Sequence, residues 1–197
     1  MNKRFDCLIG EVPDLTTEQM IEVDRAMIED FEIELIQMME NAGRNLAHLA
    51  RGRFLEGNPR GKRVVVLAGR GGNGGGAMVC ARRLSNWGAS VEVRLTREPR
   101  AFKGVPAHQL GILSRMQLPI SPPGVTAFPS ESSDVDLVVD GVIGYSLSGA
   151  PRGQAAEMIR WANGQPAPYW PWMHPRVWIR RPGTCSIPPS TPRGHSR

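Results

Sequence analysis

A glycine-rich stretch at residues 69–77 is the part of the chain best suited to bind an anion. It reads Gly-Arg-Gly-Gly-Asn-Gly-Gly-Gly-Ala and leads from an apolar run into a helix predicted to begin near Met78. Because glycine has no Cβ, backbone N–H groups can close on a phosphate at the positive end of a helix. Asn73 is the residue of this loop that can add a side-chain ligand. A flexible turn without a ligand is the alternative, although so much glycine costs backbone entropy.

Asp140 is the second candidate, because it ends the apolar run Asp136-Leu-Val-Val-Asp140 and precedes a small-residue loop at 141–150. The carboxyl ends of parallel strands share one edge of a sheet, where ligands bind, so we expect Asp140 to lie beside Asn73. A carboxylate and an amide oxygen together suit a hard cation. The alternative is that Asp140 only caps the turn after its strand.

Gly69, Gly71 and Gly74 also match the spacing of the dinucleotide-binding fingerprint. That fingerprint includes an acidic residue at the end of the second strand, which holds the ribose. Here the corresponding segment is Arg94-Leu-Thr-Arg97, which at best suits a phosphorylated ribose. The sequence therefore disfavours an ordinary dehydrogenase.

The elements that must position these residues alternate between strands and helices. Apolar residues at helical spacing predict two helices between residues 16 and 57, with a break at 30–32. Buried strands are predicted at 63–68, 90–95 and 136–140, further helices at 78–87, 104–117 and 153–161, and a loop at 119–133. This order predicts an α/β, Rossmann-like three-layer fold with a mainly parallel sheet.

Composition limits the function classes. With 197 residues, 41% of them hydrophobic, the chain can bury the core of one domain. Residues 164–197 hold five arginines and no acid, which accounts for the net charge of +5 and leaves the remainder neutral, so we expect no nucleic-acid partner. No apolar run reaches the length of a membrane span and no secretory signal is evident, so a cytoplasmic protein is expected. Cys80 is expected to be a core residue.

Three stretches together resemble the YjeF N-terminal domain, the NAD(P)H-hydrate epimerase family. They are Met39-Glu-Asn-Ala-Gly-Arg44, the glycine loop running into Ala81-Arg-Arg-Leu84, and Val139-Asp-Gly-Val-Ile-Gly144. The resemblance covers roughly residues 15–165 and implies a Rossmann-type fold that is often dimeric. It implies an isomerase that interconverts the R and S epimers of hydrated NADH or NADPH in nicotinamide nucleotide repair. A fused or separate ADP- or ATP-dependent dehydratase would use the product.

The resemblance also assigns site residues. Asn73 and Asp140 are implied as ligands of one potassium ion per subunit. The residues implied to bind the hydrated nucleotide are Gly72, Asn73, Gly74, Gly75, Gly76, Gly144, Tyr145, Ser146, Leu147, Ser148, Gly149 and Ala150. The chain departs from the family loop, Asn-Asn-Gly-Gly-Asp-Gly, at Gly72, Gly76 and Ala77, which removes an amide and a carboxylate from the pocket.

The catalytic segment of the family, Asp-x-Pro-Ser-Gly-(Leu/Ile/Val)-Asp, is missing in frame. Residues 169–179 read Tyr-Trp-Pro-Trp-Met-His-Pro-Arg-Val-Trp-Ile instead. Tryptophan and methionine have one codon each, so shifting the frame back by one base forces an aspartate across residues 172 and 173 and another across 178 and 179. The shifted frame permits Leu-Ala-Leu-Asp-Ala-Pro-Ser-Gly-Leu-Asp. The sequence thus indicates a frameshift after about residue 168.

The expected organisation is therefore an incomplete epimerase domain at residues 1–165, C-terminally truncated, followed by an out-of-frame, disordered tail at 166–197. With no catalytic aspartate in frame, we expect an epimerase of impaired activity. A Pro-rich disordered tail that is genuinely encoded is the alternative for the last segment. A non-catalytic nucleotide-binding or scaffold module of the same fold is the alternative for the function.

Overall fold

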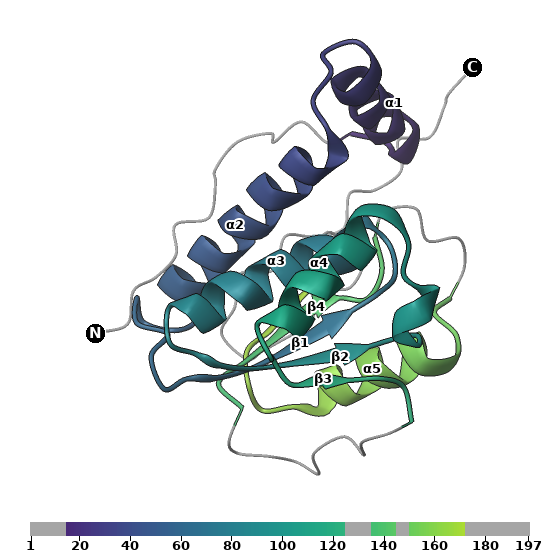
Figure 1. The fold of residues 1–197 in the computed structure, drawn as a ribbon. Helices are drawn as coiled ribbons and strands as arrows, with labels where there is room; N and C mark the ends of the chain where they lie inside the picture. The colour runs from purple at the N-terminus through teal and green to yellow at the C-terminus, as the bar shows by residue number, and fades with distance from the viewer. Residues whose placement is uncertain (1–14, 125–134, 145–149, 172–197) are drawn as a thin grey trace, which may run out of the picture.

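The structure, a computed structural model, describes residues 15–124, 135–144 and 150–171. Its centre is a five-stranded sheet in the order β3-β2-β1-β4-β5, in which every neighbouring pair is parallel (Figure 1). The strands are β1 (Arg63–Ala68), β2 (Ser90–Leu95), β3 (Ile120–Ser121), β4 (Leu137–Gly141) and β5 (Tyr169–Pro171).

Helices cover both faces of this sheet and make three layers (Figure 1). The helices are α1 (Thr17–Glu29), α2 (Leu35–Arg53), α3 (Gly72–Asn86), α4 (Gly104–Arg115) and α5 (Gly153–Gly164), with a short 3-10 turn, η1 (Pro99–Ala101). Helices α2, α3 and α4 contribute to the core on one face, and α5 packs on the other. The predicted fold class is therefore confirmed.

The alternation of side chains in β1 explains its unbroken apolar run. Val64 and Val66 pack toward α2, α3 and α4, whereas Val65 and Leu67 pack toward α5. Since each face is covered, all four side chains are fully buried. A strand buried on both faces reads as a continuous apolar run, and β1 has the predicted bounds. Strand β2 also has its predicted bounds, although it carries Glu92 and Arg94.

Three differences from the prediction go beyond shifts of one to three residues at the ends of elements. Helix α3 begins at Gly72 rather than near Met78, so the second half of the glycine loop is helical. Strand β3 lies inside the predicted loop at 119–133, of which residues 125–134 fall outside the described residues. Strand β5 lies inside the expected tail and pairs with β4, so the folded region continues to at least residue 171. Residues 172–197 lie outside the described part of the chain.

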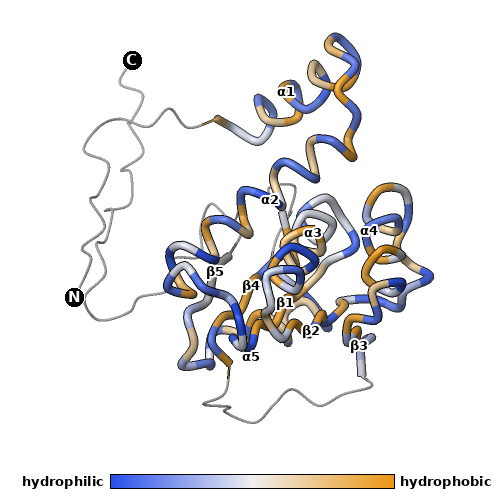
Figure 2. The backbone as a smooth tube through the Cα atoms, turned by 60° about the vertical axis from the view of Figure 1, so that its left-hand side comes forward, coloured by the Kyte–Doolittle hydropathy of each residue, from blue (hydrophilic) through white to orange (hydrophobic). Residues whose placement is uncertain are grey.

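Helix α1 lies apart from the α/β layers, beyond the N-terminal end of α2 (Figures 1 and 2). Its N-terminus is held by a reciprocal capping box, in which the Thr16 hydroxyl accepts from the Gln19 N–H and the Gln19 side chain accepts from the Thr16 N–H. No residue of α1 is buried. Among the described residues, no helix is both long enough and apolar enough to cross a membrane.

Candidate functional site

The candidate site lies where β1 and β4 end side by side. The Gly69 N–H, directly after β1, donates to the Gly141 carbonyl at the end of β4 at 3.0 Å. In the order β3-β2-β1-β4-β5, the chain leaves β1 toward β2 on one side and reaches β4 on the other. This is the topological switch point, and ligands of open parallel sheets bind in the crevice at that point.

The first turn of α3 supplies an anion-binding pole at this edge. The helix is capped by Gly71, and its first internal hydrogen bond runs from the Gly75 N–H to the Gly71 carbonyl at 3.1 Å. The N–H groups of Gly72, Asn73 and Gly74 come before that bond and have no acceptor within the helix. These N–H groups form the positive end of α3, which lies at this edge of the sheet.

Packing accounts for two of the loop glycines and for Gly43 of α2. A Cβ on Gly74 would collide with the backbone of Gly69, and one on Gly75 would collide with the Met39 side chain of α2. The Gly76 carbonyl lies 2.5 Å from the position of a Cβ on Gly43. These contacts let α2 and β1 approach α3 closely. Gly71 and Gly72, by contrast, face open space.

Asn73 and Asp140 both bond to the backbone of the turn that follows β4, at the sheet edge where the sequence predicted them. The Asn73 Nδ2 donates to the Ile143 carbonyl at 2.8 Å. The buried Asp140 Oδ1 accepts from the Val142 N–H at 2.7 Å, so Asp140 does cap the turn after β4. Gly144 borders the Asn73 amide, because a Cβ on Gly144 would lie 3.2 Å from the Asn73 Oδ1.

This turn presents oxygen donors that fit a hard, weakly charged cation. The Asn73 amide is oriented by its donated bond to Ile143, and the Asp140 carboxylate is fixed by Val142. No group of three or more His, Cys, Asp or Glu side chains occurs in the described residues, so they hold no ligand cluster typical of zinc or iron. Of the residues implied to bind nucleotide, 145–149 lie outside the described part of the chain.

A charged cluster on the other side of α3 holds three helices together. Glu40 of α2 forms ion pairs with Arg82 and, at 3.2 Å, with Arg83 of α3, and it accepts from the Gln109 Nε2 of α4 at 3.2 Å. Burial raises the pKa of the Glu40 carboxyl. The hydrogen bond and charge of Arg82, with bonds from Gln109 and Arg83, outweigh that effect and hold its pKa below the ordinary value.

Two other sequence candidates have structural roles. The buried Arg94 pairs with Glu92 at 2.8 Å, and its guanidinium lies 5.9 Å from the ring centre of Trp161. These contacts give Arg94 a role in packing rather than in binding a ribose phosphate. Cys80 is fully buried, and burial raises the pKa of its thiol, as expected of a core residue.

Sequence reasoning missed how α2 packs on its neighbours. Met39 and Gly43 lie against the first turns of α3. Glu40 reaches Arg82 and Arg83 further along α3 and Gln109 of α4. Their segment is evident from the motif Met39-Glu-Asn-Ala-Gly-Arg44, but a motif does not state which helix its side chains reach. The signal that could have indicated packing was the small residue at 43, four positions after Met39 on the same helical face.

The strand order and the helix that starts in glycine at the switch point define a Rossmann-like α/β domain. Residues 35–171 match the family model described as YjeF-related protein N-terminus, and the chain belongs to that family.

Relatives with assigned names agree with this family. The chain is 42% identical over 168 residues to the NAD(P)H-hydrate epimerase of Dehalogenimonas lykanthroporepellens, covering 83% of this chain and 64% of the relative. It is 31% identical to the NAD(P)H-hydrate epimerase of Rhodopirellula baltica, covering 80% of this chain and 62% of the relative. It is 33% identical to the bifunctional NAD(P)H-hydrate repair enzyme Nnr of Salinibacter ruber, covering 79% of this chain and 30% of that protein. The chain thus spans less than two thirds of the length of these relatives.

A solved structure supports the fold. The crystal structure of yeast ynu0 superposes with a TM-score of 0.74 at 22% sequence identity, covering 90% of this chain and 76% of the yeast chain.

Proposed function

We propose that this protein is an isomerase that interconverts the epimers of hydrated NADH or NADPH. The observation that carries the proposal is the likeness to named NAD(P)H-hydrate epimerases over most of the chain. In the site, the N–H groups of Gly72 to Gly74 offer the substrate's phosphates a positive helix end. The turn at residues 140–144 lies next to this helix end and forms the neighbouring side of the proposed binding site.

Potassium belongs to this proposal as a bound ion. Asn73 and Asp140 would hold it through their side-chain oxygens, and the ion would supply positive charge beside an anionic substrate. Both side chains are fixed by bonds to the backbone at 142 and 143, which supports a preformed site.

The chemistry requires an acid/base group near the hydroxyl-bearing ring carbon. The family's aspartate is missing in frame, and the shifted frame restores it across residues 172 and 173. The family match ends at residue 171, within a few residues of the inferred change of frame, which supports the frameshift. We therefore propose that the chain binds the substrate but turns it over weakly.

The test compares this chain with a version in which the frame is restored after residue 168. Purified R and S epimers of hydrated NADH are supplied separately, and their interconversion is followed by chromatography in potassium and in sodium buffers. We expect turnover by the restored protein and a rate lower by roughly tenfold or more in this chain. Equal rates would contradict the impairment, and no turnover by either protein would contradict the assigned reaction.

Binding without turnover by both proteins would favour the non-catalytic nucleotide-binding module instead. A dehydratase that consumes the product, fused or separate, also belongs to the proposal, since a relative is named as bifunctional. A homodimer and a cytoplasmic location stay predictions of the sequence.

A further inference from the structure

Three exposed arginines lie along the sheet edge that carries the candidate site. Arg97 follows the last residue of β2 by two positions, and Arg100 lies in η1, which continues the same turn. Arg70 follows the last residue of β1 by two positions as well. Strands β1 and β2 are parallel neighbours in which Ala68 pairs with Leu95, so these turns leave the sheet side by side. The arginines therefore lie beside the start of α3.

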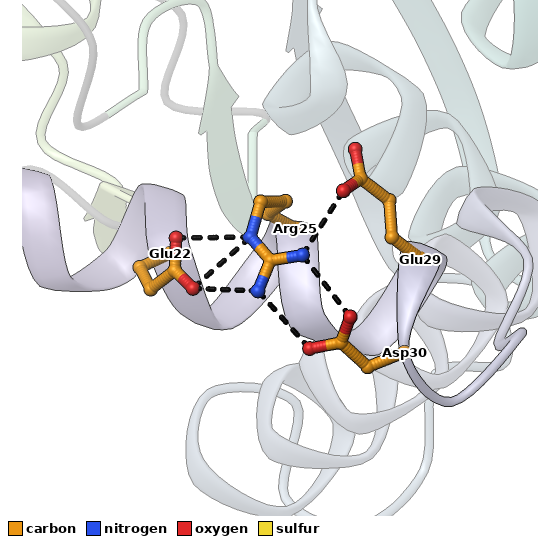
Figure 3. Close-up of polar contacts among 4 residues, drawn as sticks. All are labelled: Glu22, Arg25, Glu29 and Asp30. Atoms are coloured by element: carbon orange, nitrogen blue, oxygen red, sulfur yellow. Dashed lines mark hydrogen bonds and ion pairs between the residues drawn. The ribbon is translucent and has the colours of Figure 1, made fainter.

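Within the described part of the chain, these three guanidinium groups have no acidic partner. Arg25 of α1 shows the contrast, since it pairs with Glu22 at 2.7 Å and with Glu29 and Asp30 at 3.0 Å (Figure 3). Glu98 is the one acidic residue between residues 96 and 103 and forms no ion pair with the arginines beside it. The edge thus presents arginines whose planar donors suit a phosphate.

The turn after β2 is held at both ends. The Thr96 N–H donates to the Ala68 carbonyl of β1 at 3.0 Å. At the other end Phe102 is buried in the core, and its N–H donates to the Pro99 carbonyl at 3.1 Å. The backbone of the arginines is therefore placed by the fold before any ligand arrives, which lowers the entropy cost of binding.

The place of this turn in the sheet matches one half of a dinucleotide. In a doubly wound parallel sheet, a dinucleotide lies across the switch point with its pyrophosphate at the start of the first helix. The turn that holds Asn73 and Asp140 lies on the β4 side of that point, whereas the arginine turn lies on the β2 side. At the end of the second strand, an acid binds the free hydroxyls of the adenosine ribose, whereas an arginine accommodates a phosphorylated ribose.

We propose that Arg97, together with Arg70 and Arg100, binds the additional ribose phosphate of hydrated NADPH and makes the phosphorylated nucleotide the preferred ligand. This inference rests on the proposed function, because it names the substrate class of the same site. Arg94 takes no part, since it is buried and paired with Glu92. Hydrated NADH lacks the phosphate that these arginines would hold, so it makes fewer contacts on this side of the site.

Binding to the purified chain tests this preference without requiring turnover. Hydrated NADPH and hydrated NADH are titrated separately in potassium buffer, and their affinities are measured by isothermal titration calorimetry. We expect hydrated NADPH to bind roughly tenfold more tightly or better. R97Q should lose most of this advantage and leave the affinity for hydrated NADH unchanged. The matched control is R60Q, an exposed arginine before β1 at the opposite edge of the sheet, which should keep the original ratio.

Equal affinities of the unmodified chain for the two nucleotides would overturn this inference and leave the proposed function standing. An equal loss of affinity for both nucleotides in R97Q would also overturn it, because Arg97 would then contact a part that the two share. Absence of binding of either nucleotide, by this chain and by the frame-restored version, would overturn the proposed function and this inference with it. Far-UV circular dichroism checks that both variants keep the fold of the unmodified chain.

Discussion

At the scale of single residues, Glu40 joins three helices through one carboxylate. Its partners are Arg82, Arg83 and Gln109, and its side chain is only 31% exposed. Removing the charge leaves two guanidinium groups close together without their common anion. We expect E40Q to lower the free energy of unfolding by about 1–2 kcal/mol. Urea denaturation measures this, and E157Q on the exposed side of α5 is the matched control that should change little.

The same carboxylate predicts how stability depends on pH. The folded pKa of Glu40 lies below its ordinary value of 4.5. A lowered pKa contributes stability that is complete above that ordinary value and is lost as pH falls through the folded pKa. The gap in unfolding free energy between the unmodified chain and E40Q should therefore shrink as pH falls below 4.5. A gap that stays constant from pH 7 to pH 3 would contradict this role.

Asp136 shows that one residue can hold two strands in register. Its Oδ2 accepts from the Arg63 N–H at 2.8 Å, and its Oδ1 pairs with the Lys62 Nζ at 3.2 Å. The backbone bond joins the start of β1 to β4, whereas the ion pair is about one third exposed on both sides. We expect D136A to cost about 1–2 kcal/mol and K62A less than half of that, because surface pairs contribute little. Equal losses in thermal unfolding would assign the effect to the ion pair instead.

At the scale of elements, the start of α3 depends on the absence of side chains. Gly74 is not in the left-handed region of backbone conformation, so an alanine there is excluded by the Gly69 backbone and not by strain. Backbone cannot move aside as a flexible side chain can. We expect G74A to destabilise the fold by about 1–3 kcal/mol in denaturant unfolding. G71A faces open space one turn earlier and is the control that should leave stability nearly unchanged.

The strands could be predicted because burial on both faces leaves a continuous apolar run, as Val64 to Ala68 shows. The start of α3 could not, because glycine has a low helix propensity and only the contacts with Met39 and Gly69 reveal why it is helical there. Asn73 and Asp140 could be placed together from topology alone. The two-residue β3 carries too little pattern to predict.

At the scale of the whole molecule, the periodicity of α1 predicted a helix but not what covers it. Hydrogen exchange can measure how strongly α1 is held compared with the strands of the sheet. Amides of β1 and β4 should be protected at every protein concentration, because they lie in the core. Amides of α1 should exchange much faster, because no residue of α1 is buried. Protection of α1 as strong as that of β1 would contradict this difference.

Helix α2 has an exposed side and a side that packs on α3. Its outer side carries the exposed Arg44, Arg51 and Arg53, while on its inner side Met39 and Gly43 lie against the first turns of α3. A side chain added at position 43 would meet the Gly76 carbonyl and Val79, so α2 and the start of α3 cannot shift independently of each other.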